Sequence, residues 1–410
     1  MNTNTPGKIT IYVATALIAV VAVSAALLYG FAMPVRTMPE PTGPAVVGTV
    51  VYDLTDRSRR ERYAQVQPLP HRTIRLQLWY PAAEPSSDDA APADAASAEP
   101  IPWMIDGRRQ VRAIVSNHGF PSFLWDHTLL MDSNSYRGAP PASPPSEGLP
   151  VVVISHGWRG YRGLHADLAE ELASAGYLVA AADHSYGSAA VVLDDGRVLR
   201  SRPDILPDRD ATDRFLEHAE QLVRTFAEDD RFILDHLERV QAGRNRQGPP
   251  FLAALEGRID LTRTAAIGHS TGGGAAVYLA LTDARLDAVL GLDAWVEPIG
   301  SERLTRSAFE TPALFLRSEE WTGHPNNEYL HQFVDHAKNA ELHQTTGTTH
   351  EQFTMLYMYA PATRWAGLLG SVDPEAFADF QRRTARRFVQ THLRGGPAPA
   401  LDADFVRRIR

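Results

Sequence analysis

The sequence predicts an α/β fold class: a mostly parallel central sheet with helices on both faces, preceded by one N-terminal transmembrane helix. Three observations predict it. Short, wholly apolar runs such as residues 150–155 are typical of strands buried on both faces. Amphipathic helical patterns, such as residues 215–240, alternate with these runs, which indicates a parallel sheet covered by helices. Residues 9–35 carry no charge, and this stretch is long enough to span a bilayer.

The elements of the main domain follow from the same patterns. Residues 164–172 predict a helix with leucines on one face, and Gly176 suits its C-terminal cap. Residues 272–281 predict a further helix, which directly follows a strand. The expected strands cover residues 46–53, 74–80, 150–155, 177–183, 264–268, 288–293, 313–317 and 342–346.

The chain divides into a short N-terminal part and one large domain. The expected parts are a cytoplasmic N-terminus (1–8), a transmembrane signal anchor or signal peptide (9–33), a Pro-rich linker (34–45), the main domain (46–396) and a C-terminal tail (397–410). Low-complexity loops are expected at 81–100 and 137–148 within the main domain.

The apolar N-terminal stretch has two interpretations. The apolar region of a signal peptide is usually about 7–15 residues long, so the greater length here favours an uncleaved anchor. Cleavage near Ala25 is the alternative. Lys8 and the amino terminus precede the stretch, which favours a cytoplasmic N-terminus and a main domain outside the cytoplasm. After cleavage, the protein would instead be secreted or periplasmic.

Composition excludes several classes of function. The 410 residues include 40 Lys and Arg against 49 Asp and Glu, so the net charge of −9 gives no support for nucleic-acid binding. The absence of Cys excludes a disulfide framework, a thiol nucleophile and Cys-based metal sites. His350-Glu351 lacks the second His of an H-E-x-x-H motif, so neither a metal nor a cofactor is expected. The oligomeric state has no sequence signal.

A nucleophile motif stands between a predicted strand and a predicted helix. Gly268-His269-Ser270-Thr271-Gly272 fits G-x-S-x-G. This chemistry needs a sharp strand-to-helix turn that exposes the serine oxygen, and the flanking glycines leave room for such a turn. The same region lacks the Lys of a phosphate-binding loop. Ser270 is therefore the expected nucleophile of an acyl-transfer reaction.

Two backbone N–H groups are candidates for an oxyanion hole. In hydrolases with this turn, one N–H comes from the residue after the nucleophile and another from a loop after an earlier strand. Thr271 follows the nucleophile, and Trp158 lies in His156-Gly157-Trp158, directly after the strand at 150–155.

The expected order along the chain is serine, acid, histidine. His350 follows the last predicted strand and a Gly/Thr turn, whereas His392 lies in an Arg-rich helical stretch. The run Asp183-His184-Ser185 is excluded as a catalytic triad, because adjacent residues of a strand point to opposite faces and the three side chains cannot converge. The acid stays open at this point: Asp293 ends one strand, and Glu319 and Glu320 end the next.

Several motifs make the chain resemble the plasma-type platelet-activating factor acetylhydrolases, which are calcium-independent, lipoprotein-associated phospholipases A2 with the α/β-hydrolase fold. The resemblance runs from about residue 48 to 393, and its motifs are Leu76-Gln-Leu-Trp-Tyr-Pro81, Val153-Ile-Ser-His-Gly157, Gly268-His-Ser-Thr-Gly-Gly273, Leu292-Asp-Ala-Trp295 and Phe315-Leu-Arg-Ser-Glu319. The resemblance implies Ser270 as nucleophile, Asp293 as acid and His350, in Thr349-His-Glu-Gln-Phe353, as base. Gly157, His269, Trp295 and Phe353 become substrate-pocket candidates.

The resemblance implies hydrolysis of short or oxidised sn-2 acyl esters of phospholipids. A lipid ester is then the expected small-molecule partner, and the membrane is reached through the N-terminal helix. One alternative is a broad carboxylesterase or polyester hydrolase of the dienelactone-hydrolase-like branch. An alternative of another class is a non-catalytic α/β-hydrolase module that binds a partner, which the presence of serine, histidine and acid disfavours.

An apolar cluster between residues 120 and 131 also bears on the substrate. It includes Phe120, Phe123, Trp125, Leu130 and Met131. Core or lid packing is the simpler interpretation, because large apolar residues usually bury. If exposed, the cluster would suit a lipid interface, as the resemblance implies.

Overall fold

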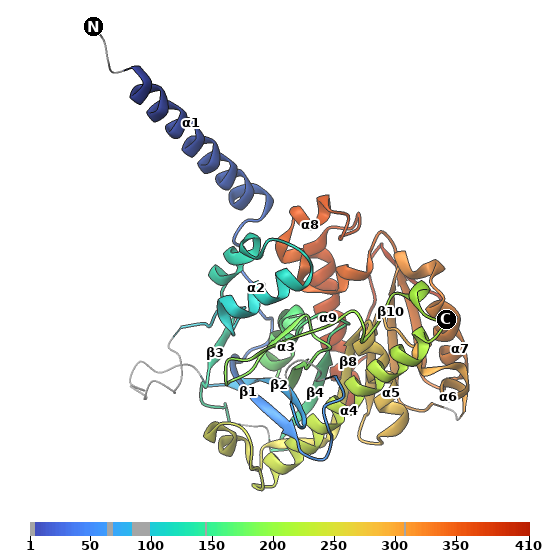
Figure 1. The fold of residues 1–410 in the computed structure, drawn as a ribbon. Coiled ribbons are helices and arrows are strands. Elements are labelled where there is room, and N and C mark those ends of the chain that lie inside the picture. Colours follow the sequence, from blue (N-terminus) through green and yellow to red (C-terminus); the bar gives the residue numbers. More distant parts are fainter. Residues whose placement is uncertain (1–4, 64–68, 84–98, 144–145, 307–308) are drawn as a thin grey trace.

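The computed structural model describes residues 5–63, 69–83, 99–143, 146–306 and 309–410. Most of the expected loop at 81–100, and residues 144–145 of the loop at 137–148, lie outside the described residues. The described part contains one large sheet with helices on both of its faces, and α1 projects from it (Figure 1).

The large sheet is mostly parallel, as predicted. The strands β5, β4, β8, β9, β10 and β11 run parallel, whereas β2 pairs antiparallel with both β5 and β1. In spatial order the strands are β12 (Val406–Arg408), β11 (Ala340–Thr345), β10 (Ala313–Ser318), β9 (Ala288–Leu292), β8 (Ile259–His269), β4 (Leu149–Ser155), β5 (Leu178–His184), β2 (Arg72–Ala82), β1 (Val46–Asp56) and β3 (Ser135–Arg137). A separate hairpin joins β6 (Ala190–Val192) to β7 (Val198–Arg200).

Helices cover both faces of the sheet and bury two apolar cores. One core contains α4 (Phe215–Gln241), α5 (Thr271–Thr282), α6 (Ser301–Thr305) and α7 (Asn326–His336). The other contains α2 (Gly107–Asn117), α3 (Ala166–Ser174) and α9 (Pro374–Arg394). Strand β4 serves both cores, because Val151 and Val153 face the first and Val152 and Ile154 the second. Full burial of each such side chain stabilises the fold by about 1.5–3 kcal/mol.

The N-terminal helix stands apart from the domain. Helix α1 (Thr5–Leu27) continues into a π-helical turn at Leu28–Ala32 and projects away from the sheet (Figure 1). Residues Thr10–Ala32 have a mean hydropathy of 2.5, and the domain buries no residue of the most apolar stretch within them. The helix is therefore long and apolar enough to cross a membrane, and a signal sequence at this position has the same properties.

The apolar cluster at residues 120–131 divides between burial and exposure. It forms the 3₁₀ helix η2 (Ser122–Leu130) and its flanks. Met131 is fully buried, whereas Phe120, Phe123 and Leu130 are 53%, 57% and 69% exposed. Met131 therefore packs in the core, whereas the three exposed side chains leave a lipid interface as a prediction.

Candidate active site

The candidate residues gather at one edge of the sheet. Ser270 follows β8, Asp293 follows β9, His350 comes shortly after β11, and Gly157 comes shortly after β4. The carboxyl ends of parallel strands meet at the same edge, where α/β proteins place their ligands. Parallel pairing of β4, β8, β9, β10 and β11 thus brings together residues separated by almost 200 positions.

Ser270 occupies the sharp turn between β8 and α5. Its φ of 55° and ψ of −120° are strained values for a residue with a side chain. The turn is held by its backbone: the Ser270 N–H donates to the Leu292 carbonyl at 3.1 Å, and the Trp295 N–H donates to the Ser270 carbonyl at 2.8 Å. The strain is therefore stabilised by neighbouring segments, as expected for a nucleophile turn.

Glycines around Ser270 permit close backbone approach. A Cβ at Gly268 would lie 2.1 Å from the Gly272 carbonyl oxygen, and one at Gly272 would lie 2.1 Å from the Ser155 carbonyl oxygen. At Gly157 it would lie 2.9 Å from the Ser270 Cβ. Side chains at Gly268 and Gly272 would collide with neighbouring backbone, and one at Gly157 would collide with Ser270, so close packing requires glycine at all three positions.

Asp293 contacts His350 directly. The carboxylate lies 2.8 Å from the His350 Nδ1 and is 1% exposed. Its position is set by Ser318, whose backbone N–H and hydroxyl donate to the two carboxylate oxygens at 2.9 and 2.6 Å. Sequence reasoning missed Ser318, although it stands inside one of the family-like motifs.

The other two acids considered for this role bind backbone instead. Glu320 accepts the His350 backbone N–H at 2.6 Å, and Glu319 accepts the Gly347 N–H at 2.6 Å. Both acids therefore support the loop that carries His350, while Asp293 alone among the three candidates meets the imidazole.

The environment of His350 favours its protonated form. Burial would lower the pKa of His350, but the hydrogen bond and charge of Asp293, with the charges of Glu351 and Glu320, outweigh burial and raise it. The imidazole is stacked on Trp321, with ring centroids 4.2 Å apart and planes 4° apart, and His269 lies 4.5 Å away on tilted planes. Trp321 had no sequence signal as a site residue.

Two backbone N–H groups near Ser270 are free to bind a ligand. Within the described residues, neither the Trp158 N–H nor the Thr271 N–H has a hydrogen-bond acceptor. The Thr271 N–H opens α5, where the helix dipole favours negative charge. An oxyanion hole requires N–H donors that have no acceptor within the protein, and both groups meet this condition.

A cavity of about 400 Å³ lies beside the turn that carries Ser270. Ser270, His350, Gly157, Trp158 and His269 line it. Apolar side chains form most of the remaining wall, namely Met33, Ile114, Phe120, Leu124, Trp125, Leu164, Leu356, Tyr359 and Leu368. Its size and apolar lining suit a small organic ligand. Arg159 also lines it and adds a positive charge.

Two of the four substrate-pocket candidates lie elsewhere. Gly157 and His269 line the cavity, but Trp295 and Phe353 do not. Trp295 is buried, and its indole N–H donates to Glu297 at 3.1 Å. Phe353 is fully buried and packs edge-on against Phe377. Both rings are buried in the core, so the structure does not bring these two candidates to the cavity.

The Asp183-His184-Ser185 run does not form a site of its own. Asp183 accepts the Arg162 backbone N–H at 2.6 Å, while the Ser185 hydroxyl donates to the Thr73 carbonyl. His184 contacts Ser155 and Asp229 instead. The three neighbours point to different partners, as the strand period requires.

The mostly parallel sheet and the strained serine turn are those of an α/β-hydrolase. The chain belongs to the family described as platelet-activating factor acetylhydrolase, isoform II, whose model matches residues 34–403. The match confirms the resemblance that the motifs indicated.

Relatives and a solved structure agree with this class. The chain is 24% identical to the platelet-activating factor acetylhydrolase of Cavia porcellus over 80% of its length and 73% of that protein. It is 25% identical to the one from Gallus gallus, over 62% of this chain and 64% of that protein. A ferulic acid esterase from Streptomyces cinnamoneus superposes with a TM-score of 0.70 at 25% identity, covering 92% of this chain and all of that one.

Proposed function

We propose that the protein is a serine ester hydrolase that cleaves short or oxidised sn-2 acyl esters of phospholipids through Ser270, His350 and Asp293. The observation that carries this proposal is the hydrogen bond of 2.8 Å between Asp293 and His350, beside the strained turn of Ser270. The mostly apolar cavity and the family of the chain support it.

The proposed reaction has two steps. His350 takes the proton of Ser270 as the serine oxygen attacks the ester carbonyl, and Asp293 stabilises the imidazolium that forms. The Trp158 and Thr271 N–H groups bind the oxyanion of the tetrahedral intermediate. That intermediate collapses to an acyl-enzyme, and His350 returns its proton to the leaving alcohol. Water, deprotonated by His350, then releases the acid and restores Ser270.

Active-site labelling tests this mechanism. A small fluorophosphonate should modify the wild-type chain at Ser270, and Ser270→Ala should abolish labelling. Ser188→Ala is a matched control, because Ser188 is buried and donates or accepts at the His156 Nε2, away from the cavity. Labelling of Ser270→Ala to the wild-type extent would refute the proposed nucleophile.

The proposed preference for a phospholipid rests on Arg159, the one arginine among the described residues that line the cavity. One Nη of Arg159 donates to the Asn117 carbonyl, and the rest of the guanidinium can meet a phosphate. Arg159→Gln should therefore reduce kcat/KM for an sn-2 acetyl phospholipid by about tenfold or more, given the strength of charge-assisted hydrogen bonds, and leave an acetyl aryl ester unchanged. The exposed Arg214→Gln is the control.

A broad carboxylesterase is the second candidate. The full-length likeness to a ferulic acid esterase favours it. Equal kcat/KM for sn-2 acetyl phospholipid, aryl ester and polyester film, with no effect of Arg159→Gln, would establish this candidate over the phospholipid.

We further propose that α1 is a single-pass anchor that keeps the catalytic domain outside the cytoplasm. Protease accessibility of the domain in intact cells, and the mass of the mature N-terminus, would distinguish the anchor from a cleaved signal peptide.

A further inference from the structure

We propose that the segment joining α1 to the domain, residues 28–36, is a fixed wall of the substrate cavity. In this arrangement Met33 limits the length of the acyl chain, and the cavity takes its lipid ester from the bilayer that α1 spans. The inference rests on the proposed function and adds to it the route and the size of the substrate.

The end of α1 is held between two parts of the domain. The Tyr29 hydroxyl donates to the Phe123 carbonyl at 3.2 Å, and its ring lies 5.6 Å from that of His127. Phe31 lies 5.6 Å, ring to ring, from Trp365 at the end of α8 (Ala362–Trp365). The segment thus bridges η2 and α8, which both border the cavity.

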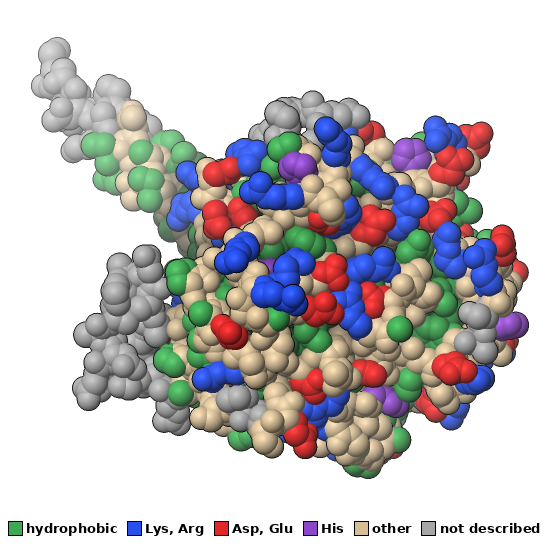
Figure 2. All heavy atoms as spheres, turned by 90° about the horizontal axis from the view of Figure 1, so that it is seen from below, with side chains coloured by type: hydrophobic (Ala, Val, Ile, Leu, Met, Phe, Trp, Pro, Cys, Tyr) green, Lys and Arg blue, Asp and Glu red, His purple; other side chains and the backbone are tan. Residues whose placement is uncertain are grey.

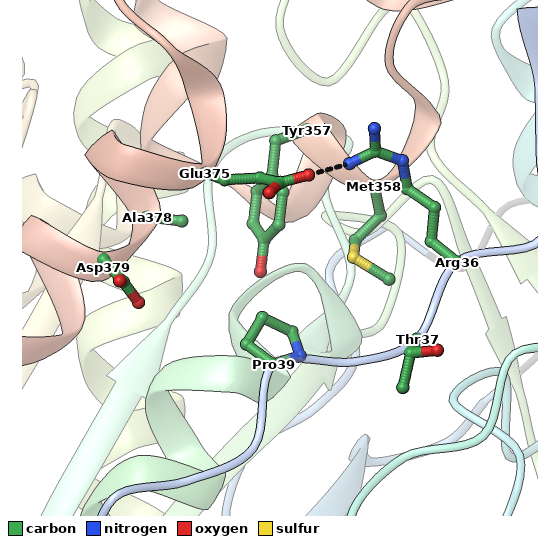
Figure 3. Close-up of a pocket in the computed structure, with 8 residues that line it drawn as sticks. All are labelled: Arg36, Thr37, Pro39, Tyr357, Met358, Glu375, Ala378 and Asp379. Atoms are coloured by element: carbon green, nitrogen blue, oxygen red, sulfur yellow. Dashed lines mark hydrogen bonds and ion pairs between the residues drawn. The ribbon is translucent and has the colours of Figure 1, made fainter.

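The chain from Arg36 to Glu40 is held against the domain by three contacts. Arg36 forms an ion pair with Glu375 at 2.8 Å on the rim of a second cavity of about 470 Å³ (Figure 3). The Pro39 carbonyl accepts from Asn134 at 3.0 Å, and the Glu40 carbonyl accepts from Arg382 at 3.1 Å. The expected spacer therefore lies against the domain, and it holds the base of α1 at a set position.

Met33 is the residue of this segment that reaches the catalytic cavity. It is 6% exposed and lines the cavity together with Leu124 and Leu356. An apolar pocket of fixed length discriminates chains that differ by single methylenes by about tenfold or more. Val35, two residues on, is 49% exposed and lies outside the described lining, so it provides a matched control.

Exposed apolar side chains surround the same region. Outside α1, the large apolar side chains more than a third exposed are Phe31, Val35, Phe120, Phe123, Leu130, Leu216, Trp365 and Leu368 in the described part of the chain. All but Leu216 belong to the docked segment, to η2 and its flank, or to α8 and its flank. Phe120 and Leu368 line the cavity as well.

The position of α1 indicates what covers these side chains. The face of the domain turned away from α1 carries acidic and basic side chains interspersed (Figure 2). Aromatic residues concentrate where proteins meet the membrane surface, and here they gather where an apolar helix leaves the domain. The occupant of the apolar surface in this proposal is the bilayer that α1 enters, and Phe120 and Leu368 connect that surface to the cavity.

Acyl-length selectivity tests the wall. Met33→Trp should lower kcat/KM for a hexanoyl aryl ester at least tenfold relative to the acetyl ester, whereas Met33→Ala should raise the same ratio and Val35→Trp should leave it unchanged. Because the Ala variant removes volume, it keeps the test valid if the Trp variant folds poorly. An unchanged ratio in both Met33 variants would refute the wall.

Vesicle assays of the full chain test the route. Reconstituted in phosphatidylcholine vesicles, the protein should hydrolyse an sn-2 acetyl phospholipid faster in its own vesicles than in separate ones. A flexible ten-residue insertion between Leu27 and Leu28 should lower the rate in its own vesicles without changing hydrolysis of a soluble acetyl ester. An unchanged rate would refute the route. If the fluorophosphonate failed to label Ser270 in the wild-type chain, the proposed function itself would be refuted.

Discussion

Two sets of Ser, His and Asp lie in the same domain, and they differ in what surrounds them. Ser155, His184 and Asp229 form a chain of hydrogen bonds, with 3.2 Å between the Ser155 Oγ and the His184 Nε2 and 2.9 Å between the His184 Nδ1 and Asp229. All three are at most 1% exposed. In the other set, Ser270 and His350 line a cavity, and Asp293 contacts His350.

The charges around the two aspartates are also different. Asp229 accepts hydrogen bonds from Arg72 and Arg59 as well as from His184. Burial would raise the pKa of Asp229, but these two arginines hold it far below its ordinary range. Burial lowers the pKa of His184, and Arg72 and Arg59 reinforce that effect against Asp229. The pKa of His350 is raised instead.

The comparison indicates that a hydrogen-bonded Ser, His and Asp are not by themselves sufficient for catalysis. A histidine that acts as general base takes up a proton, and the aspartate beside it stabilises the positive charge that forms. In the buried set, Arg72 and Arg59 already neutralise the carboxylate of Asp229. We infer that Ser155, His184 and Asp229 hold β4, β5 and α4 together, whereas the Ser270 set does the chemistry.

The largest expected effect is on the catalytic rate, after a substitution in the Ser270 set. Asp293→Asn should reduce kcat for a short-chain aryl ester by roughly 10⁴-fold, because the neutral amide no longer stabilises the imidazolium. Glu320→Gln keeps an acceptor for the His350 N–H and should lose far less. Steady-state kinetics measure both, and the reverse ranking would assign the acid to Glu320.

The buried set should respond in stability. Asp229→Ala leaves Arg72, which is 3% exposed, without its main partner and should lower the free energy of unfolding by about 3–5 kcal/mol. Glu217→Ala breaks the exposed pair with Arg214 and should change it by less than about 1 kcal/mol. Denaturant unfolding measures both, and similar values would contradict a structural role for Asp229.

Ser155→Ala should have a smaller effect. It removes the hydroxyl that contacts the His184 Nε2, and an unpaired buried group costs about 1–3 kcal/mol. The folded variant should keep fluorophosphonate labelling at Ser270. If labelling disappeared while the protein stayed folded, Ser155 would belong to the catalytic machinery.

The smallest expected effect is a shift in pH dependence. His350 accepts a proton only when neutral, so the rate falls as pH drops through its pKa. Because that pKa is raised, the acid limb of kcat/KM should lie above the ordinary value for histidine. Glu320→Gln removes one negative charge and should move the limb to lower pH with little change in the plateau. A shift to higher pH would contradict the assignment of His350.

Local patterns predicted most of the fold. All eight expected strands are present: short apolar runs predicted strands buried on both faces, and alternation predicted the strand at residues 74–80. The shorter strands β3, β6, β7 and β12 were missed, since three-residue strands carry almost no periodicity. Gly176 does close α3, with a φ of 94°.

The sequence by itself determined the position of Ser270, because a G-x-S-x-G motif between strand and helix states its own geometry. Order along the chain left Asp293, Glu319 and Glu320 equivalent, and the family resemblance favoured the first. Only the tertiary structure separated them, by placing one carboxylate on the imidazole and the other two on backbone N–H groups. It also brought Met33 to the cavity and Arg72 to Asp229. Such contacts join residues far apart in the chain, so no local pattern encodes them.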